Sequence, residues 1–120
     1  MTFNSITMST KQTKDIQIHV ELDQEQVPTK ISWNADDNIA GGTIPCKAIM
    51  LSFWDHNQKD TLKLDLWTRD MTVDEMKIFF HQTLVSMTET LHNATGDERI
   101  AGDMSDFCDY FAEKMEIKAK

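Results

Sequence analysis

Residues 72–96 (TVDEMKIFFHQTLVSMTETLHNATG) constrain the fold most, because every local signal in them predicts one long amphipathic helix. Thr72 and Glu75 have the spacing of a capping box, in which each side chain binds a free backbone amide at the helix start. Gly96 can adopt the left-handed conformation that ends a helix. Apolar residues at helical spacing form one stripe, which the rest of a small chain is expected to cover; they are Val73, Met76, Phe80, Leu84, Met87 and Leu91.

A second helix is predicted directly after Gly96, over residues 97–117. Asp97 is a suitable N-cap, because its carboxylate can accept hydrogen bonds from the first free amides. Because the link is so short, the two helices are expected to form an αα-hairpin or a sharp corner. A second apolar stripe consists of Ile100, Met104, Phe107, Cys108, Phe111 and Met115.

Three earlier segments alternate apolar and polar residues, which is typical of half-buried strands. They are residues 15–23, 29–35 and 61–68. The short turn at residues 24–28 favours an antiparallel hairpin of the first two strands. Residues 36–42 (DDNIAGG) are expected to form a loop.

Residues 43–55 (TIPCKAIMLSFWD) are apolar on every side, so periodicity does not decide their structure. We favour a buried helix, because Thr43 can cap it and few residues are β-branched. The alternative is a strand, which Phe53 and Trp54 would suit. The helix gives the order ββαβαα and the strand gives ββββαα, as in the export chaperone SecB. Either order predicts an α+β fold with a small antiparallel sheet covered on one face by helices.

A length of 120 residues fits one domain, expected over residues 15–118 after a flexible polar tail at residues 1–14. An alternative translation start at Met8 stays open. No apolar run approaches the roughly 18 residues that span a bilayer, and no signal-peptide pattern is present. We therefore expect a cytoplasmic protein that does not span the membrane.

The charge balance excludes some partners. Twelve Lys and Arg residues against twenty Asp and Glu residues give a formal net charge of −8. Nucleic acids and anionic membranes require a basic surface, so neither is an expected partner.

No motif for catalysis, phosphate binding or metal binding is present. His81 and His92 share a helix face but would lie about 16 Å apart, too far for one metal ion. Cys46 and Cys108 are expected to be reduced thiols, with Cys108 in the core. No catalytic residue, cofactor or metal ligand is predicted, and the chain is not expected to be an enzyme. A minor alternative is an unrecognised enzyme site using Asp65, Asp70 and His81.

Four residues are candidate partner contacts. Trp67 falls on the polar face of its strand, where a partly exposed aromatic ring shields a sheet edge or contacts a partner. Asp103, Asp106 and Asp109 recur every three residues. They form either a solvated outer face or an acidic patch for a basic partner.

Four segments carry a resemblance to a known family. They are KAIMLSFWD (47–55), TLKLDLWTRDM (61–71), VDEMKIFFHQTLVSM (73–87) and DFCDYFAEKMEIK (106–118). Together they resemble the gliding-motility protein GldC family of Bacteroidetes. The resemblance implies a small cytoplasmic accessory protein of the gliding machinery, and it transfers no activity, cofactor or catalytic residue.

Two classes of function follow. The first is a non-catalytic adaptor that binds proteins of the motility or secretion apparatus. If residues 43–55 form a strand, the SecB-like order would favour a chaperone-like homo-oligomer, by analogy of topology alone. The second class is the small enzyme described above.

Overall fold

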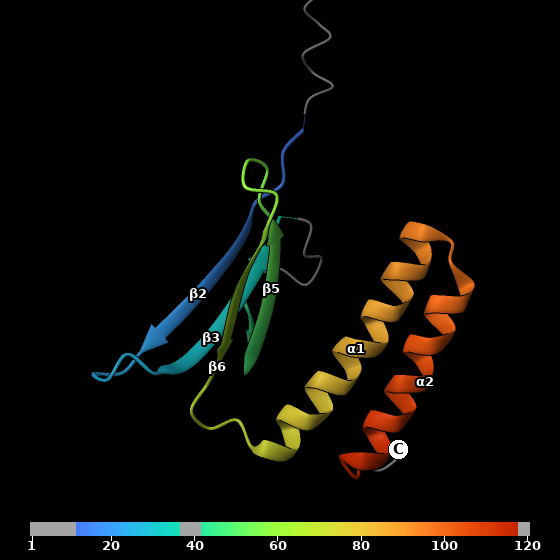
Figure 1. Ribbon diagram of the computed structural model, residues 1–120. Coiled ribbons are helices and arrows are strands. Elements are labelled where there is room, and N and C mark those ends of the chain that lie inside the picture. The colour runs from blue at the N-terminus through green and yellow to red at the C-terminus, as the bar shows by residue number, and fades with distance from the viewer. Residues whose placement is uncertain (1–11, 37–41, 118–120) are drawn as a thin grey trace, which may run out of the picture. The chain divides into compact units, whose positions relative to one another are not determined.

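The computed structural model describes residues 12–36 and 42–117, and it confirms the α+β class (Figure 1). The chain divides after Asp70 into a strand unit and a helix unit. The strands are β2 (Ile16–Leu22), β3 (Pro28–Ala35), β4 (Ile44–Cys46), β5 (Ala48–Trp54) and β6 (Thr61–Trp67). The helices are α1 (Val73–Thr95) and α2 (Glu98–Lys114).

Strands β2 and β3 form the predicted antiparallel hairpin. Their alternation places apolar residues opposite one another on one face, as in the pairs Ile18–Trp33 and Val20–Ile31. The other face carries polar pairs such as His19 and Ser32. Ile31 is the most buried apolar side chain that the structure describes, with 1% of its surface exposed. The core of the strand unit therefore lies against the apolar face of this hairpin.

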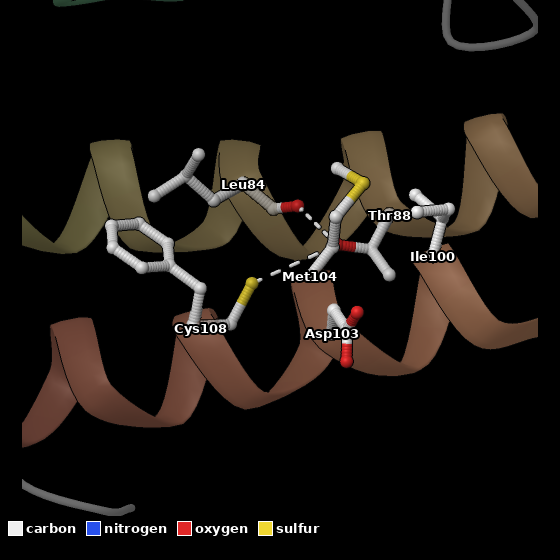
Figure 2. Close-up of a pocket in the computed structure, with 7 residues that line it drawn as sticks. Leu84, Thr88, Ile100, Asp103, Met104 and Cys108 are labelled. Carbon is white, nitrogen blue, oxygen red and sulfur yellow. Dashed lines mark hydrogen bonds between the residues drawn. The ribbon is translucent and has the colours of Figure 1, made fainter.

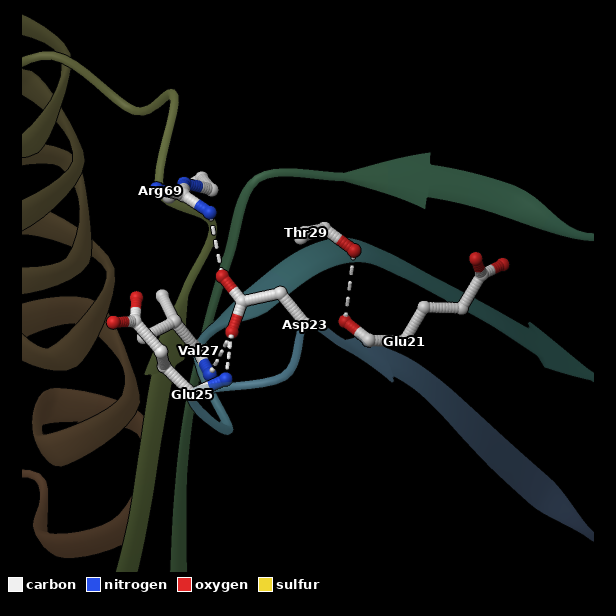
Figure 3. Close-up of polar contacts among 6 residues, drawn as sticks. All are labelled: Glu21, Asp23, Glu25, Val27, Thr29 and Arg69. Atoms are coloured by element: carbon white, nitrogen blue, oxygen red, sulfur yellow. Dashed lines mark hydrogen bonds and ion pairs between the residues drawn. The ribbon is translucent and has the colours of Figure 1, made fainter.

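The turn between β2 and β3 is held by Asp23 (Figure 3). Its carboxylate accepts hydrogen bonds from the backbone amides of Glu25 (2.8 Å) and Val27 (3.1 Å). The guanidinium of Arg69 forms an ion pair with the same carboxylate at 2.5 Å. The turn after β2 is thus tied to the segment that follows β6, 46 residues later in the chain.

The helix favoured for residues 43–55 is wrong, because this segment forms strands β4 and β5. β4 pairs with β3, and β5 pairs with β6 along its whole length. Pro45 has no amide to donate, and it lies opposite Ser32 in the short pairing of β4 with β3. When β4 and β5 are taken as one strand broken at Lys47, the order is the alternative ββββαα.

The strands form two antiparallel sheets rather than the single sheet predicted. One has the order β2-β3-β4, and the other is the two-stranded ribbon β5-β6. Two backbone hydrogen bonds anchor the end of the ribbon. The amide of Thr68 donates to Lys47 (2.8 Å), and the amide of Arg69 donates to Pro28 at the start of β3 (3.0 Å).

The helix unit contains the predicted αα-hairpin, in which α1 and α2 lie side by side (Figure 1). Thr72 and Glu75 form both hydrogen bonds of the capping box. Gly96 ends α1 in the left-handed region at φ 69°, and the Asp97 carboxylate accepts hydrogen bonds from the amides of Arg99 and Ile100. Neither helix has the apolar length that a membrane span requires.

Several sequence predictions fall outside the described residues. These are most of the N-terminal tail, including Met8, and positions 37–41 of the loop. The single domain over residues 15–118 and the covering of one sheet face by the helices stay predictions.

Candidate functional site

Few apolar side chains are buried within either unit. Among the described residues, Ile31 and Cys108 are the buried hydrophobic side chains, with 1% and 5% of their surface exposed. Large apolar side chains are exposed on every strand except β3 and β4, and on both helices. Extended apolar surface of this kind marks protein contacts more often than it marks chemistry.

Trp67 lies at the end of β6, opposite Ala48 on β5, and 54% of its surface is exposed. This confirms the predicted partial exposure of the ring. An ion pair between Lys63 and Asp65 (3.3 Å) lies on the same strand, on the same face as Trp67. Trp54 lies on that face at the opposite end of the ribbon and is also exposed. This face therefore has an exposed indole ring at each end and charged groups between them.

The opposite face of the ribbon is entirely apolar. Successive side chains of a strand point to opposite faces, so the residues that alternate with the polar ones in β5 and β6 all lie on this face. Its cross-strand pairs are Ile49–Leu66, Leu51–Leu64 and Phe53–Leu62. Phe53, Leu62 and Leu64 are exposed within the strand unit. A two-stranded ribbon is marginally stable by itself, so packing against this face would stabilise it.

The helix hairpin carries an apolar groove with a volume of about 220 Å³ (Figure 2). At its base, the Thr88 hydroxyl donates to the Leu84 carbonyl (2.9 Å) and lies 3.7 Å from the sulfur of Cys108. The groove is lined by Leu84, Thr88, Ile100, Asp103, Met104, Phe107 and Cys108. Most of these residues belong to the two apolar stripes predicted from the sequence, but the stripes alone did not predict that a groove would remain between them.

The apolar surface extends beyond the groove along both helices. Residues three or four positions apart share a helix face, so Phe80 and Met87 lie on the Leu84 face of α1. Both are exposed, and so are Ile100 and Phe107 on α2. The helix unit therefore presents a broad apolar face centred on the groove.

Of the three predicted acidic contacts, the structure brings one to the groove. Asp103 lines it, while Asp106 and Asp109 are exposed elsewhere on α2. A spacing of three residues turns by about 300° around a helix, so each successive carboxylate is displaced by about 60° from the previous one. The three carboxylates therefore spread from the groove toward the outer face of α2.

The residues of the alternative enzyme site each have a local partner. The carboxylate of Asp65 pairs with Lys63, and that of Asp70 accepts a hydrogen bond from the Thr68 hydroxyl at 2.6 Å. The ring of His81 stacks on Phe111, with 6.3 Å between the ring centroids. In the described part of the chain, no three His, Cys, Asp or Glu side chains are grouped so that they could hold a metal ion.

The two cysteines are free thiols. Burial raises the pKa of the Cys46 thiol above its ordinary value, against a smaller opposing effect of the Ala48 amide. Cys46 lies in β4 and not at a helix start, where the pKa of a thiol would be lowered. Cys108 is buried in the helix unit, which confirms its predicted place in the core.

Comparison with known proteins adds one match. The family described as "Gliding motility-associated protein GldC-like" matches residues 28–117. The match runs from the first residue of β3 to beyond the end of α2, so it includes residues of both units. No curated protein and no solved structure matches the chain.

Proposed function

The chain belongs to the GldC-like family of gliding motility-associated proteins. We propose that it is a non-catalytic accessory protein that binds other proteins of the gliding or secretion apparatus in the cytoplasm. The proposal includes association of the chain with further copies of itself. The observation that supports it best is the amount of apolar and aromatic surface that each unit leaves exposed.

Two surfaces suit such contacts. The exposed Trp67 ring offers a large contact area at low entropic cost, as aromatic residues at binding hot spots do. The groove of the helix hairpin could accept an amphipathic segment of a partner. Asp103 at the groove, with Asp106 and Asp109 beside it, would favour basic residues on that partner.

A chaperone that binds unfolded segments is the second candidate function. The observed order ββββαα supports it, because this order resembles that of SecB. Broad apolar faces would also suit the binding of varied unfolded chains. The analogy is one of topology, which does not by itself imply function.

The accessory role is tested by gene deletion in a gliding bacterium that carries this protein. We expect the deletion to reduce colony spreading and the unaltered gene to restore it. A gene encoding Trp67→Ala should restore spreading poorly, because the substitution removes the exposed ring without touching the buried Ile31.

The comparison variant is Trp54→Ala, which removes the same side chain from the other end of the same ribbon face. With both variants present at wild-type levels on an immunoblot, poor spreading with Trp67→Ala alone would assign the contact to Trp67, and poor spreading with both would assign it to the whole face. Full spreading with Trp67→Ala would exclude Trp67 as a partner contact. Normal gliding in the deletion strain would contradict the accessory role itself.

A further inference from the structure

Among the described residues, strand β2 has an open edge. It is the outer strand of the sheet β2-β3-β4, and within the described residues it pairs with β3 alone. The amide of Asp36 donates to the Asp15 carbonyl at 3.2 Å, so Asp15 directs its backbone groups toward β3. In an antiparallel ladder this direction alternates, so Ile16, Ile18 and Val20 direct their amides and carbonyls away from β3. These groups form a continuous hydrogen-bonding edge.

The edge lacks the features that usually block strand pairing. Natural edge strands carry lysine, proline, inward-pointing charges or early bulges, or they are very short. β2 has seven residues without lysine or proline, and its one register shift lies between Glu21 and Leu22 at its end. At the two ends of its apolar face, Ile16 and Leu22 are 68% and 48% exposed. Among the described residues nothing occupies this edge, so it can accept another strand.

The sequence of β2 is complementary to itself in an antiparallel arrangement. If two copies pair about His19, all seven residues find an opposite residue. On one face Ile16 meets Leu22 and Ile18 meets Val20, so apolar side chains meet apolar ones. On the other face Gln17 meets Glu21, so no two carboxylates oppose one another within the strand.

We propose that β2 pairs with the β2 strand of a second copy of this chain, which joins two three-stranded sheets into one six-stranded sheet. This inference deepens the proposed self-association by naming the surface on which two copies meet.

The charge distribution favours this edge over more acidic surfaces. The net charge of −8 opposes contact between copies in general, but β2 carries only one acidic residue, Glu21. Just beyond the strand, Asp15 would face Asp23 of the second copy. Asp23 is already paired with Arg69, so its charge is partly neutralised. Pairing of one strand buries less surface than a permanent interface, so we expect a reversible dimer.

The test is sedimentation velocity of the full chain over a concentration series. We expect the wild-type chain to shift from monomer to dimer as its concentration rises. Gln17→Glu places a carboxylate opposite Glu21 of the other copy at two symmetric positions, and should raise the dissociation constant roughly 2- to 30-fold. Gln17→Lys places an ammonium there and should retain or strengthen the dimer. Gln58→Glu, which makes the same change in net charge in the β5–β6 turn, should behave as wild type.

A backbone variant separates strand pairing from general charge effects. Ile16→Pro removes one outward amide at the first residue of the strand, where proline is tolerated. It should weaken the dimer while circular dichroism stays at the wild-type value. A wild-type chain that is monomeric throughout, or a dimer unaffected by both Gln17→Glu and Ile16→Pro, would overturn the inference. Sedimentation reports association between copies of the chain and not binding to other proteins, so that outcome would leave the accessory role, tested by colony spreading, unchanged.

Discussion

Asp23 shows how one side chain organises a turn and a distant segment together. The hydrogen bond from the Val27 amide, then that from the Glu25 amide and the charge of Arg69, lower the pKa of the Asp23 carboxyl from its ordinary value. These effects outweigh desolvation, which would raise the pKa. Because the pKa is lower in the folded chain, the ionised carboxylate stabilises the fold above the unfolded pKa. This stabilisation is lost as pH falls through the folded pKa.

We therefore expect Asp23→Asn to lower the melting temperature at neutral pH. The difference from wild type should shrink as the pH falls below about 3.8, the ordinary pKa of the group. Thermal unfolding followed by circular dichroism at several pH values measures it. Glu25→Gln is the control in the same turn, because its side chain does not bind the turn amides, and it should melt close to wild type. If the melting temperature of Asp23→Asn differs from that of wild type by the same amount down to acidic pH, the ionised Asp23 carboxylate does not stabilise the fold.

A helix or strand can be predicted from nearby residues where a side chain at its end forms a hydrogen bond with a free backbone group. The Thr72 hydroxyl accepts a hydrogen bond from the Glu75 amide at 3.0 Å, and the Glu75 carboxylate accepts one from the Thr72 amide at 2.9 Å. These bonds satisfy two of the amides that a helix start leaves free. The Asp97 carboxylate caps α2 in a similar way, whereas Gly96 ends α1 through its left-handed backbone conformation.

Thr72→Ala should destabilise the chain by about 1 kcal/mol, because it removes the side chain that caps α1. Urea unfolding would measure this loss. Thr90→Ala makes the same replacement at an exposed position inside α1, where the hydroxyl only bonds the Ser86 carbonyl. It should be neutral or slightly stabilising, since alanine is the better helix former. Equal losses from both replacements would show that the effect at Thr72 does not arise from the cap.

The whole molecule has little buried apolar surface within each unit. The strand unit is centred on Ile31 and the helix unit on Cys108. The stripe predicted for residues 72–96 lies partly toward α2, through Leu84, and partly on the exposed face, through Phe80 and Met87. Any contact that covers these exposed apolar faces would therefore add to the stability of the fold.

If copies associate, the melting temperature of the wild-type chain should rise with its concentration, since association stabilises only the folded state. With Gln17→Glu the melting temperature should rise less with concentration, while with Gln58→Glu it should rise as in the wild-type chain. Differential scanning calorimetry at several concentrations measures the effect. A melting temperature that is independent of concentration would argue against folding-linked association.

The candidate partner contacts were only partly predictable from the sequence. The exposure of Trp67 followed from the alternation of its strand, and the exposure of the three aspartates followed from their helical spacing. The groove beside Asp103 depends on how two apolar stripes pack, which is set by side-chain shape rather than by pattern. The ion pair of Asp23 with Arg69 joins residues 46 apart and has no local signal.

The sequence by itself determined the elements whose signals are local: the two capped helices, the alternating strands and the turn between β2 and β3. Each depends on the periodicity of apolar residues, or on a side chain that forms a hydrogen bond with a backbone group only a few residues away. Only the tertiary structure decided residues 43–55 and the division of the strands into two sheets. A segment that is apolar on every side suits a buried helix or a strand equally well. Here the hydrogen-bonding partners supplied by β3 and β6 favoured strands.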